Sequence, residues 1–412
     1  MPIICWGNLA KSASETTRIE QSMMGYVEAH DENPNAHMGP DYALGAHRLQ
    51  TILDHAPYSI LNKFTYPQAR VYKCIVDPAG YGDQTDIQAA IDYVNGLGGG
   101  SVLIKAGTYT LSADLILYSN IALIGEDDDT TILDFANGNY NVQIEGTSGT
   151  HKRNILFNNF QITRSGKSGQ AAVQMDFVDD ILFERVYFKD NFKAGIGPNG
   201  DISAEQSVNR FNIKNCRSSG NFGFLNITGF NNCKISGCQI GAQGGGADLI
   251  ILGSGTHLEI ENNYFDNIVD RVIYSESSPY GVTIECNTII GATTASGIPM
   301  IDFLDSSKIK IIANYIDARN KYNYIIYLLR TNYCSIVDNY LYNSTADGIY
   351  LSDSDYNIIN SNHVLSCGGW GVNISDAASI KNGVVGNEVR NNVSGAIQDL
   401  GTNNEIAHNI IT

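Results

Sequence analysis

The 412-residue sequence predicts an all-β solenoid in which short strands stack into a parallel β-helix. Three observations lead to this prediction: a short phrase that returns with one Asn in each copy, apolar residues that alternate around that Asn, and a regular period. A period of about 20 to 50 residues is typical of solenoids, because one repeat cannot bury its own apolar face and must stack on its neighbours.

The repeated phrase is an aliphatic residue, two variable residues, Asn, one variable residue and a second apolar residue. Successive Asn positions differ by 24, 27, 25, 23, 25 and 22 residues. Asn tolerates the left-handed backbone of a bend, and amides stacked at a strand spacing of about 4.8 Å can form a hydrogen-bonded ladder. We therefore expect a ladder of Asn263, Asn287, Asn314, Asn339, Asn362, Asn387 and Asn409.

Short segments of alternating apolar residues flank each Asn, as Leu258 and Ile260 do before Asn263. A period of two predicts half-buried strands, and Gly or Asp between them, as at residues 347–348, predicts turns. Each repeat is thus one rung of two or three strands. The same frame continues toward the N-terminus with apolar or small residues in the Asn position, namely Phe160, Val186, Cys216 and Cys238.

The cysteines follow the repeat. Cys233 and Cys334 fall two positions before the aliphatic residue of the phrase, where other copies have Leu258 or Val282. Buried free Cys behaves as a small hydrophobic residue. Because the sequence has no C-x-x-C pair and no metal-ligand spacing, we expect core cysteines, no metal site and no cofactor.

An amphipathic helix is predicted before the first rung. Thr85 or Asp86 begins it, and residues 86–96 can cover the end of a stack that would otherwise expose apolar side chains and strand edges. Residues 101–105 are then the first expected strand. The predicted buried face of the helix consists of Ile87, Ala90, Ile91 and Val94.

Residues 1–70 differ from the rest, with two short amphipathic helices around a loop rich in Asn and Pro. Such helices are too small to hold a core alone, so we expect an attachment or oligomerisation region. The predicted domains are this region, an opening segment with the capping helix at 71–100, and the β-helix at 101–412. Residues 406–412 are still a rung, so we expect another chain to cover that end.

The net charge is −17, from 43 acidic and 26 basic residues, with no basic run. Nucleic acid is therefore not an expected partner, because phosphate backbones are bound by clustered Lys and Arg. The N-terminus lacks the pattern of a signal peptide, and no stretch approaches the roughly 18 apolar residues of a membrane span. We expect cytoplasmic synthesis, no membrane insertion, and a place in a virion or extracellular particle.

Residues 80–92, 98–109 and 119–133 contain Gly80-Tyr-Gly-Asp83, Gly98-Gly-Gly-Ser-Val and Ile124-Gly125-Glu. These segments are similar to the opening of the pectate-lyase-like β-helix superfamily, which includes tail spikes, pectin-active lyases, polygalacturonases and alginate epimerases. The resemblance, which the repeats extend to the end of the chain, implies a right-handed, single-stranded β-helix. Residues 31–37 and 54–63 resemble connectors in phage tail fibre and virion structural proteins.

The enzyme signatures of that superfamily are not found. Polygalacturonase-like sites combine an Asp pair with a His-Gly, but Asp179 and Asp180 have no His-Gly after them. The Asp-Pro-His of alginate epimerases is absent, and calcium carboxylates followed by an Arg proton acceptor have no clear match. Because this fold serves enzymes, binding proteins and structural parts alike, catalysis stays open.

Four residues are the candidate catalytic group: Asp248, Asp270, Arg271 and Glu276. Counted from the Ile of each phrase, Asp248 and Asp270 fall near equivalent positions of adjacent rungs, about 5 Å apart. Two close carboxyls supply the acid and base of glycoside cleavage, and Arg271 can orient a uronate. The alternative is that these are solvated turn residues.

Tyrosines crowd the rungs between residues 315 and 356. Some must face outward, and an exposed Tyr beside polar groups suits sugar recognition, although packing alone would also explain the pattern. Nearby cations suit an acidic glycan. The predicted carbohydrate-binding residues are Tyr322, Tyr324, Arg319, Lys321 and Arg330.

The sequence therefore predicts a virion-associated or tail-spike-like structural β-helix that contacts cell-surface polysaccharide. A polysaccharide lyase or glycoside hydrolase is the first alternative, and an assembly protein without a ligand is the second. The expected partners are copies of the chain in a homo-oligomer such as a trimer, or other virion proteins, together with surface polysaccharide.

Overall fold

The computed structural model describes residues 72–412 except 137, 165, 167–169, 191, 198–206, 242–247, 276 and 295–296. The predicted N-terminal attachment region, with its two helices, lies outside the described residues. Residues Tyr72–Thr412 form one compact unit.

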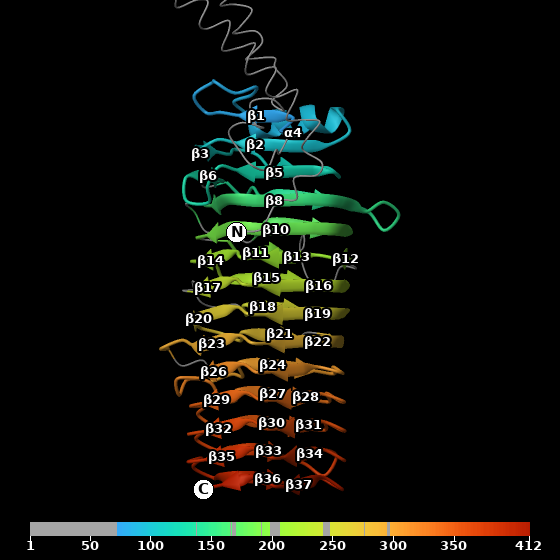
Figure 1. Cartoon of the computed structure of the whole chain (residues 1–412), viewed down its shortest axis with the longest axis vertical. Coiled ribbons are helices and arrows are strands. Elements are labelled where there is room, and N and C mark those ends of the chain that lie inside the picture. Colours follow the sequence, from blue (N-terminus) through green and yellow to red (C-terminus); the bar gives the residue numbers. More distant parts are fainter. Residues whose placement is uncertain are drawn as a thin grey trace, which may run out of the picture. The chain divides into compact units, whose positions relative to one another are not determined.

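This unit is a parallel β-helix, as the sequence predicts. Its strands lie one above the other in chain order (Figure 1) and form a 12-stranded and a 26-stranded sheet in which neighbouring strands are parallel. The 12-stranded sheet consists of β4 (Leu115–Ile116), β7 (Val142–Glu145), β9 (Ala171–Asp176), β11 (Ala194–Gly197), β15 (Gly223–Ile227), β18 (Ile250–Leu252), β21 (Ile273–Ser275), β24 (Ile301–Leu304), β27 (Ile326–Leu329), β30 (Ile349–Ser352), β33 (Trp370–Ile374) and β36 (Gly395–Asp399).

The 26-stranded sheet has two bands, joined by β8 (Lys152–Thr163) and β10 (Val178–Lys189), which run through both. The first band consists of β1 (Cys74–Val76), β2 (Gly100–Ile104), β5 (Ile121–Gly125), β12 (Val208–Asn209), β13 (Asn212–Lys214), β16 (Phe230–Ser236), β19 (Gly255–Glu261), β22 (Pro279–Glu285), β25 (Lys310–Ile312), β28 (Ser335–Val337), β31 (Ile358–Asn360), β34 (Gly383–Val385) and β37 (Glu405–Ala407). The second band consists of β3 (Gly107–Thr110), β6 (Thr131–Asp134), β14 (Arg217–Ser219), β17 (Gln239–Gly241), β20 (Tyr264–Ile268), β23 (Thr288–Gly291), β26 (Tyr315–Asp317), β29 (Tyr340–Tyr342), β32 (His363–Leu365), β35 (Glu388–Arg390) and β38 (Ile410–Ile411).

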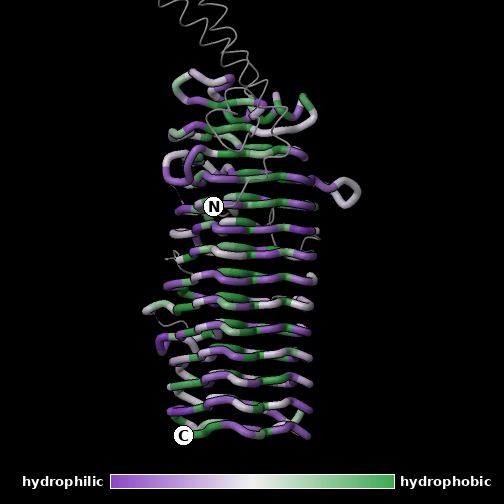
Figure 2. The backbone as a smooth tube through the Cα atoms, in the orientation of Figure 1, coloured by the Kyte–Doolittle hydropathy of each residue, from purple (hydrophilic) through white to green (hydrophobic). Residues whose placement is uncertain are grey.

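The core lies between the sheets, and the sequence repeat determines which side chains are buried in it. The aliphatic residues of successive phrases pair in register, as Ile260 does with Ile284 and Ile284 with Ile311, and all three are buried. Burying each such side chain contributes about 1.5–3 kcal/mol. Figure 2 shows hydrophobic and hydrophilic residues alternating along the rungs, as a period of two requires.

The early rungs keep the same register with aromatic residues in the core. Phe160 pairs with Val186, as the frame predicts, and the rings of Phe157 and Phe183 stack with centroids 4.5 Å apart. The core cysteines are also confirmed: none of the described cysteines forms a disulfide, and six are buried, namely Cys74, Cys216, Cys233, Cys238, Cys334 and Cys367.

The Asn ladder is confirmed. The side-chain oxygen of Asn314 accepts hydrogen bonds from the backbone N–H and the side-chain amide of Asn287, at 2.9 and 3.0 Å. The amide of Asn314 in turn donates to Asn339 Oδ1 at 3.0 Å. The pattern repeats from Asn263 to Asn409. Each amide thus satisfies backbone groups that the bend leaves without strand partners.

The backbone reason given for these Asn residues is wrong. The left-handed residue is the one before each ladder Asn, for example Asn262 with φ 54°, Ala313 with φ 53° and Ser361 with φ 57°. The ladder position is selected for its amide hydrogen bonds and not for a positive φ. The corner residue before it has the positive φ but does not need a side-chain amide, so its identity varies from rung to rung.

A second ladder, which the sequence analysis missed, lies at the corner where the chain enters the first band. Asn382 Oδ1 accepts from the backbone N–H of Asn357 at 2.9 Å, and Asn404 Oδ1 accepts from that of Asn382 at 2.7 Å. These residues occupy the position that Leu258 and Cys334 hold in earlier rungs. The signal was present in the sequence, because this position also recurs with the repeat.

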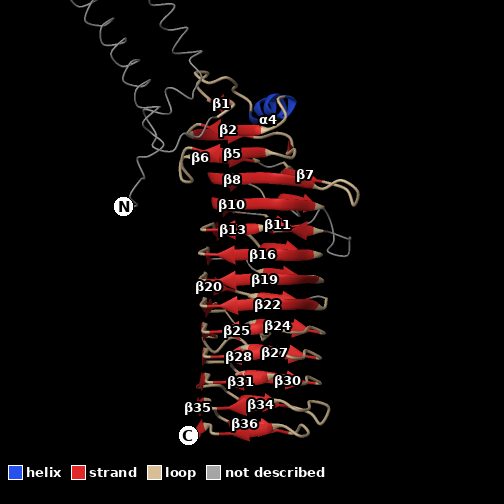
Figure 3. Ribbon diagram, turned by 45° about the vertical axis from the view of Figure 1, so that its right-hand side comes forward, coloured by secondary structure: helices blue, strands red, loops and turns tan. Residues whose placement is uncertain are grey.

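The predicted capping helix is α4 (Ile87–Gly96), the single helix among the described residues. Asp86 is its N-cap and accepts a hydrogen bond from the backbone N–H of Ala89 at 2.7 Å. The predicted face of Ile87, Ala90, Ile91 and Val94 is buried. In Figure 3, α4 lies beside β1 and β2. The stack begins earlier than residue 101, because β1 precedes the helix and pairs with β2.

Two further features concern the surface. No helix of the described residues is long and apolar enough to cross a membrane. On the last strands, β37 and β38, the apolar side chains of Ile406, Ile410 and Ile411 are exposed. That another chain covers them stays a prediction.

Candidate functional site

A polar and aromatic surface lies on the outward face of the 12-stranded sheet, on β21, β24, β27 and β30. The pairings of these strands place Tyr274, Asp302, Tyr327 and Tyr350 in one column. Neighbouring residues of such a column are about 4.8 Å apart. The residues on either side of the column, such as Ile301 and Phe303, point into the core and are buried. We call this surface the tyrosine-rich face.

Arg271 joins two carboxylates on this face. Its Nε and Nη2 donate to Asp248 Oδ1 and Oδ2 at 2.8 and 2.9 Å, and its Nη1 donates to Asp302 Oδ2 at 3.0 Å. The guanidinium carbon also lies 3.4 Å from the ring centroid of Tyr274. Side-chain exposure is 25% for Arg271 and 13% for each carboxylate, so the group is largely shielded from water.

Burial and charge act in opposite directions on this group. Burial raises the pKa of the Asp302 carboxyl, the hydrogen bond and charge of Arg271 oppose the rise, and Asp248 adds to it. The net direction is upward. For Arg271, burial lowers the pKa, but its hydrogen bonds to Asp248 and Asp302 outweigh burial and raise it. Arg271 therefore stays charged, and Asp302 is the group on this face that is biased toward protonation.

Three tyrosine rings form a cluster beside Asp302. The ring centroid of Tyr350 lies 4.8 Å from that of Tyr324 and 5.1 Å from that of Tyr327, with the latter pair parallel to within 5°. All three side chains are half-buried. Burial, followed by neighbouring tyrosines and aspartates, raises the pKa of Tyr324 and of Tyr327. Both therefore keep their hydroxyl protons at neutral pH.

Asp347 and Asn373 extend the face beyond the tyrosines. Asp347 Oδ1 accepts from the backbone N–H of Trp370 at 2.6 Å, and its Oδ2 accepts from the side-chain amide of Asn373 at 2.9 Å. The Oδ1 atom of Asn373 is buried and makes no hydrogen bond within the described part of the chain. It is thus an acceptor whose partner the described residues do not supply.

The predicted catalytic group is only partly brought together. Asp248 and Arg271 meet, but the residue opposite Asp248 is Arg271 and not Asp270, because Ile250 pairs with Ile273. Compared with the preceding rung, this rung has one extra residue between β21 and β22. The sequence-based alignment of Asp248 with Asp270 required two extra residues. Asp270 is half-buried just before Arg271, and Glu276 lies outside the described residues.

Asp302, the second partner of Arg271, was missed. It lies within an apolar run from residue 300 to residue 304, which hides its outward direction. The available signal was its register, since it occupies the same strand position as Tyr274 and Tyr327.

The predicted carbohydrate-binding residues separate. Tyr322 is fully buried and donates its hydroxyl to the Ile268 carbonyl, so it belongs to the core, and burial raises its pKa to about 12. Arg330 pairs with Asp305 at 2.6 Å on an exposed surface. Lys321 lies in the turn before Tyr322, where its backbone N–H bonds the Ala318 carbonyl.

The other two residues lie on different faces. Tyr324 belongs to the tyrosine-rich face, whereas Arg319 is on the second band, with its Nη2 3.5 Å from Asp266 Oδ1. These residues were predicted together because they are close along the chain, between residues 319 and 330. Within that distance, however, the chain bends from one face of the β-helix to the next.

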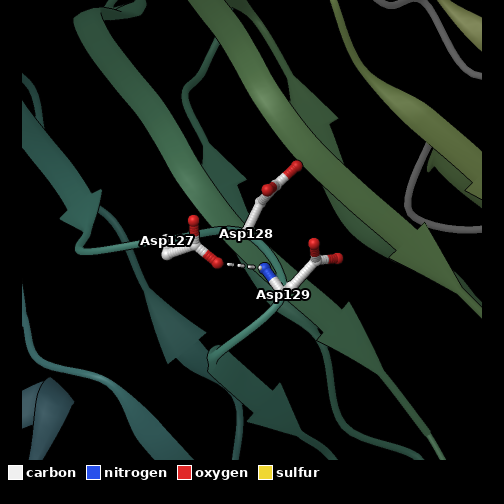
Figure 4. Close-up of side chains that lie close together, drawn as sticks. All are labelled: Asp127, Asp128 and Asp129. Atoms are coloured by element: carbon white, nitrogen blue, oxygen red, sulfur yellow. Dashed lines mark hydrogen bonds between the residues drawn. The ribbon is translucent and has the colours of Figure 1, made fainter.

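Three adjacent carboxylates, Asp127, Asp128 and Asp129, lie close enough together to hold a metal ion (Figure 4). Arg217 already donates to Asp128 Oδ2 at 3.0 Å and to Asp129 Oδ1 at 2.6 Å. Asp127 Oδ1 accepts from the backbone N–H of Asp129 at 2.9 Å. The turn is thus explained by its contacts within the chain.

Residues 248–411 match the family model described as the right handed beta helix region. No curated protein matches the sequence. Among solved structures, tailspike protein 3 of bacteriophage CBA120 is similar with a TM-score of 0.59 and 13% identity, over 90% of this chain and 69% of that one.

Two further structures are similar at this level. Pre-mature gene product 12 of bacteriophage phi29 has a TM-score of 0.61 and 13% identity, over 86% of this chain and 57% of that one. PfbA, a surface adhesin of Streptococcus pneumoniae, has a TM-score of 0.56 and 15% identity, over 76% and 87%. The described chain is therefore a right-handed parallel β-helix, the fold that these phage proteins and this adhesin share.

Proposed function

We propose that the chain is a virion-associated or tailspike-like protein that binds cell-surface polysaccharide with its tyrosine-rich face. The cluster of Tyr324, Tyr327 and Tyr350 beside Asp302 carries this proposal. Aromatic rings offer a flat apolar surface to a sugar ring, while carboxylates and amides at its rim bind the hydroxyls. The fold shared with a tailspike and an adhesin supports it.

The charges of the face favour a neutral sugar over an acidic one. Asp248, Asp302 and Asp347 outnumber Arg271, and Arg271 is already bound by two of them. An acidic glycan would meet this excess of negative charge without an available cation. A hydroxyl-rich ligand instead can donate hydrogen bonds to carboxylate acceptors such as Asp302, whose side chain is 13% exposed.

Affinity electrophoresis tests this proposal in gels that contain dextran, mannan or a soluble β-glucan, with polygalacturonate as the acidic comparison. Replacing Tyr327 and Tyr350 together with Ala should weaken binding to a neutral polymer about tenfold or more, the equivalent of about 1.4 kcal/mol. The matched control is Tyr333→Ala with Tyr356→Ala, a stacked pair elsewhere with centroids 5.0 Å apart. Equal losses in both variants, or no retardation by any neutral polymer, would contradict the proposal.

A polysaccharide-cleaving enzyme is the second candidate, and the raised pKa of Asp302 favours it, because a protonated carboxyl is what a general acid requires. Incubation with the same polymers should then yield shorter saccharides, detected as new reducing ends or unsaturated products. Asp302→Asn should abolish them while binding persists. If all of these polymers remain intact after prolonged incubation, cleavage of these polysaccharides is excluded.

A further inference from the structure

A groove with a volume of about 580 Å³ lies on the second band, on a different sheet from the tyrosine-rich face. It crosses β10, β14, β17 and β20, and Arg319 reaches it from the turn after β26. It is lined by Tyr187, Arg217, Gln239, Tyr264, Asp266 and Arg319, among others. The proposed function does not use these residues.

Small residues explain why the surface is hollow at this place. The column of outward residues that contains Lys189 and Asp266 has Ser219 and Gly241 between them. In strand register, these two positions supply almost no side-chain volume across about 10 Å of the stack. The flanking column has large side chains instead, including Tyr187 and Tyr264. The groove is therefore built by the sequence of four successive rungs.

One wall of the groove is fixed by charge. The Arg217 guanidinium carbon lies 4.4 Å from the ring centroid of Tyr187, and Arg217 is bound by Asp128 and Asp129. The hydroxyls of Tyr187 and Ser219 are 2.6 Å apart. These contacts hold the Tyr187 ring in place, so that little conformational entropy is lost when a ligand binds against it.

The opposite wall has groups that are incompletely satisfied. Asp266 Oδ1 is buried and makes no hydrogen bond with any described residue. Arg319 Nη2 lies 3.5 Å away, which is an ion pair but too loose for a hydrogen bond. Tyr264 beside them is 43% exposed. The side chains of Asp266 and Arg319, 38% and 37% exposed, and the exposed Tyr264 ring thus line one hollow, as in a site that binds vicinal hydroxyls over an aromatic surface.

The charges decide the chemical class of the ligand. Arg217 is paired with two carboxylates, Asp128 and Asp129, and Arg319 with Asp266, so these groups leave one surplus negative charge. Lys189, whose Nζ lies 5.9 Å from the ring centroid of Tyr187, offsets that charge, so the groove has no surplus positive charge for an acidic ligand. Its polar groups are amides, hydroxyls and paired charges, which suit a polyhydroxylated neutral molecule. We propose that this groove is a second saccharide site, which binds a neutral glycan segment independently of the tyrosine-rich face.

The test uses the full chain labelled with 3-fluorotyrosine, with fluorine resonances assigned by single Tyr→Phe variants. Adding dextran, mannan or β-glucan oligosaccharides should shift the resonances of Tyr264 and Tyr187. The signals of Tyr327 and Tyr350 report the first face separately. Failure of one site is therefore distinguishable from failure of the other. Tyr280, 37% exposed on β22, is the control signal and should not move.

Affinity electrophoresis then measures the contribution of the groove. Tyr264→Ala should weaken retardation by the responding neutral polymer about fivefold, both in the wild-type background and with Tyr327 and Tyr350 replaced by Ala. Tyr280→Ala should behave as its parent. Gln239→Ala, at an exposed groove position, gives an independent measurement if Tyr264→Ala does not fold.

Three results would overturn the proposal. The first is an unchanged Tyr264 signal with every neutral oligosaccharide. The second is a stronger response to polygalacturonate oligosaccharides than to neutral ones, which would assign an acidic ligand. The third is unaltered binding by both Tyr264→Ala and Gln239→Ala.

Discussion

At the scale of single residues, Asn339 shows what the ladder contributes. Its amide donates to the Ile311 carbonyl at 2.8 Å and to Asn362 Oδ1 at 2.9 Å, and its oxygen accepts from Asn314. All these groups are buried, so that a missing partner leaves them away from water. An unsatisfied buried polar group costs about 1–3 kcal/mol.

We expect Asn339→Ala to lower the free energy of unfolding by about 3 kcal/mol, because at least two buried backbone groups lose their partner. Asn409→Ala, at the half-buried last ladder position, should cost about 1 kcal/mol, since water can replace part of its bonding. Urea unfolding followed by far-UV circular dichroism measures both. If the two variants unfold at the same urea concentration, the buried amides do not carry the stability assigned to them.

The raised pKa of Asp302 leads to a second prediction, which concerns the pH dependence of stability. Because this pKa is raised in the folded state, the folded chain binds a proton more tightly than the unfolded chain, and stability falls as pH rises through the raised pKa. Asp302→Asn removes the titration. The free energy of unfolding of the variant minus that of the wild type should therefore increase as pH rises above the ordinary carboxyl range. Chemical denaturation at several pH values measures it, and a difference that is flat or falls with pH would contradict it.

At the scale of elements, α4 should stabilise only the rungs that it touches. In a solenoid each repeat contacts its neighbours alone, so a local defect has a local effect. Ile91 is fully buried, whereas Tyr93 on the same helix is 52% exposed. We expect Ile91→Ala to cost about 3 kcal/mol and Tyr93→Ala almost nothing.

Amide hydrogen exchange gives the spatial measurement. In Ile91→Ala, the amides of β1 and β2 should exchange faster than in the wild type, while those of β28 should be unchanged. Uniformly faster exchange along the whole stack would mean that the unit unfolds as one cooperative block.

Strands and register were predictable because a period of two assigns one set of residues to the core, and a shift by one residue would expose the whole set. The pairing of Ile260 with Ile284 follows directly. Turn lengths were not predictable in the same way, since polar residues tolerate either choice. For that reason Asp270 was placed opposite Asp248. Asp302 was missed for a different reason, because the apolar residues on either side of it hide its outward direction.

Tyr322 shows another limit of the sequence. A turn residue next to polar neighbours reads as exposed, but its ring fills a space above Gly291, where an added Cβ would meet the ring at 2.5 Å. Long-range packing of this kind leaves no periodic signal in the sequence. The groove was missed for a related reason, because each successive rung contributes only a few of its lining residues, and these are separated by a whole rung along the chain.

At the scale of the whole molecule, the open question is assembly. We expect the full chain to form a homo-oligomer and residues 72–412 alone to be monomeric, because the predicted N-terminal helices are too small to hold a core by themselves. Light scattering at micromolar concentration measures both masses. Oligomers of equal size would move the contact to the β-helix, and two monomers would weaken the virion proposal.

The corner residues before the ladder have a wider consequence. All have a positive φ, yet they include Asn262, Cys286, Ala313, Asp338 and Ser361, which share neither size nor charge. Backbone geometry and surface chemistry are thus encoded by neighbouring but separate positions. Whole rungs can therefore be duplicated or exchanged, and their outward side chains substituted, while the hydrogen bonds of the backbone and the ladder are kept. The stack is therefore a modular scaffold on which recognition surfaces can diversify without refolding the chain.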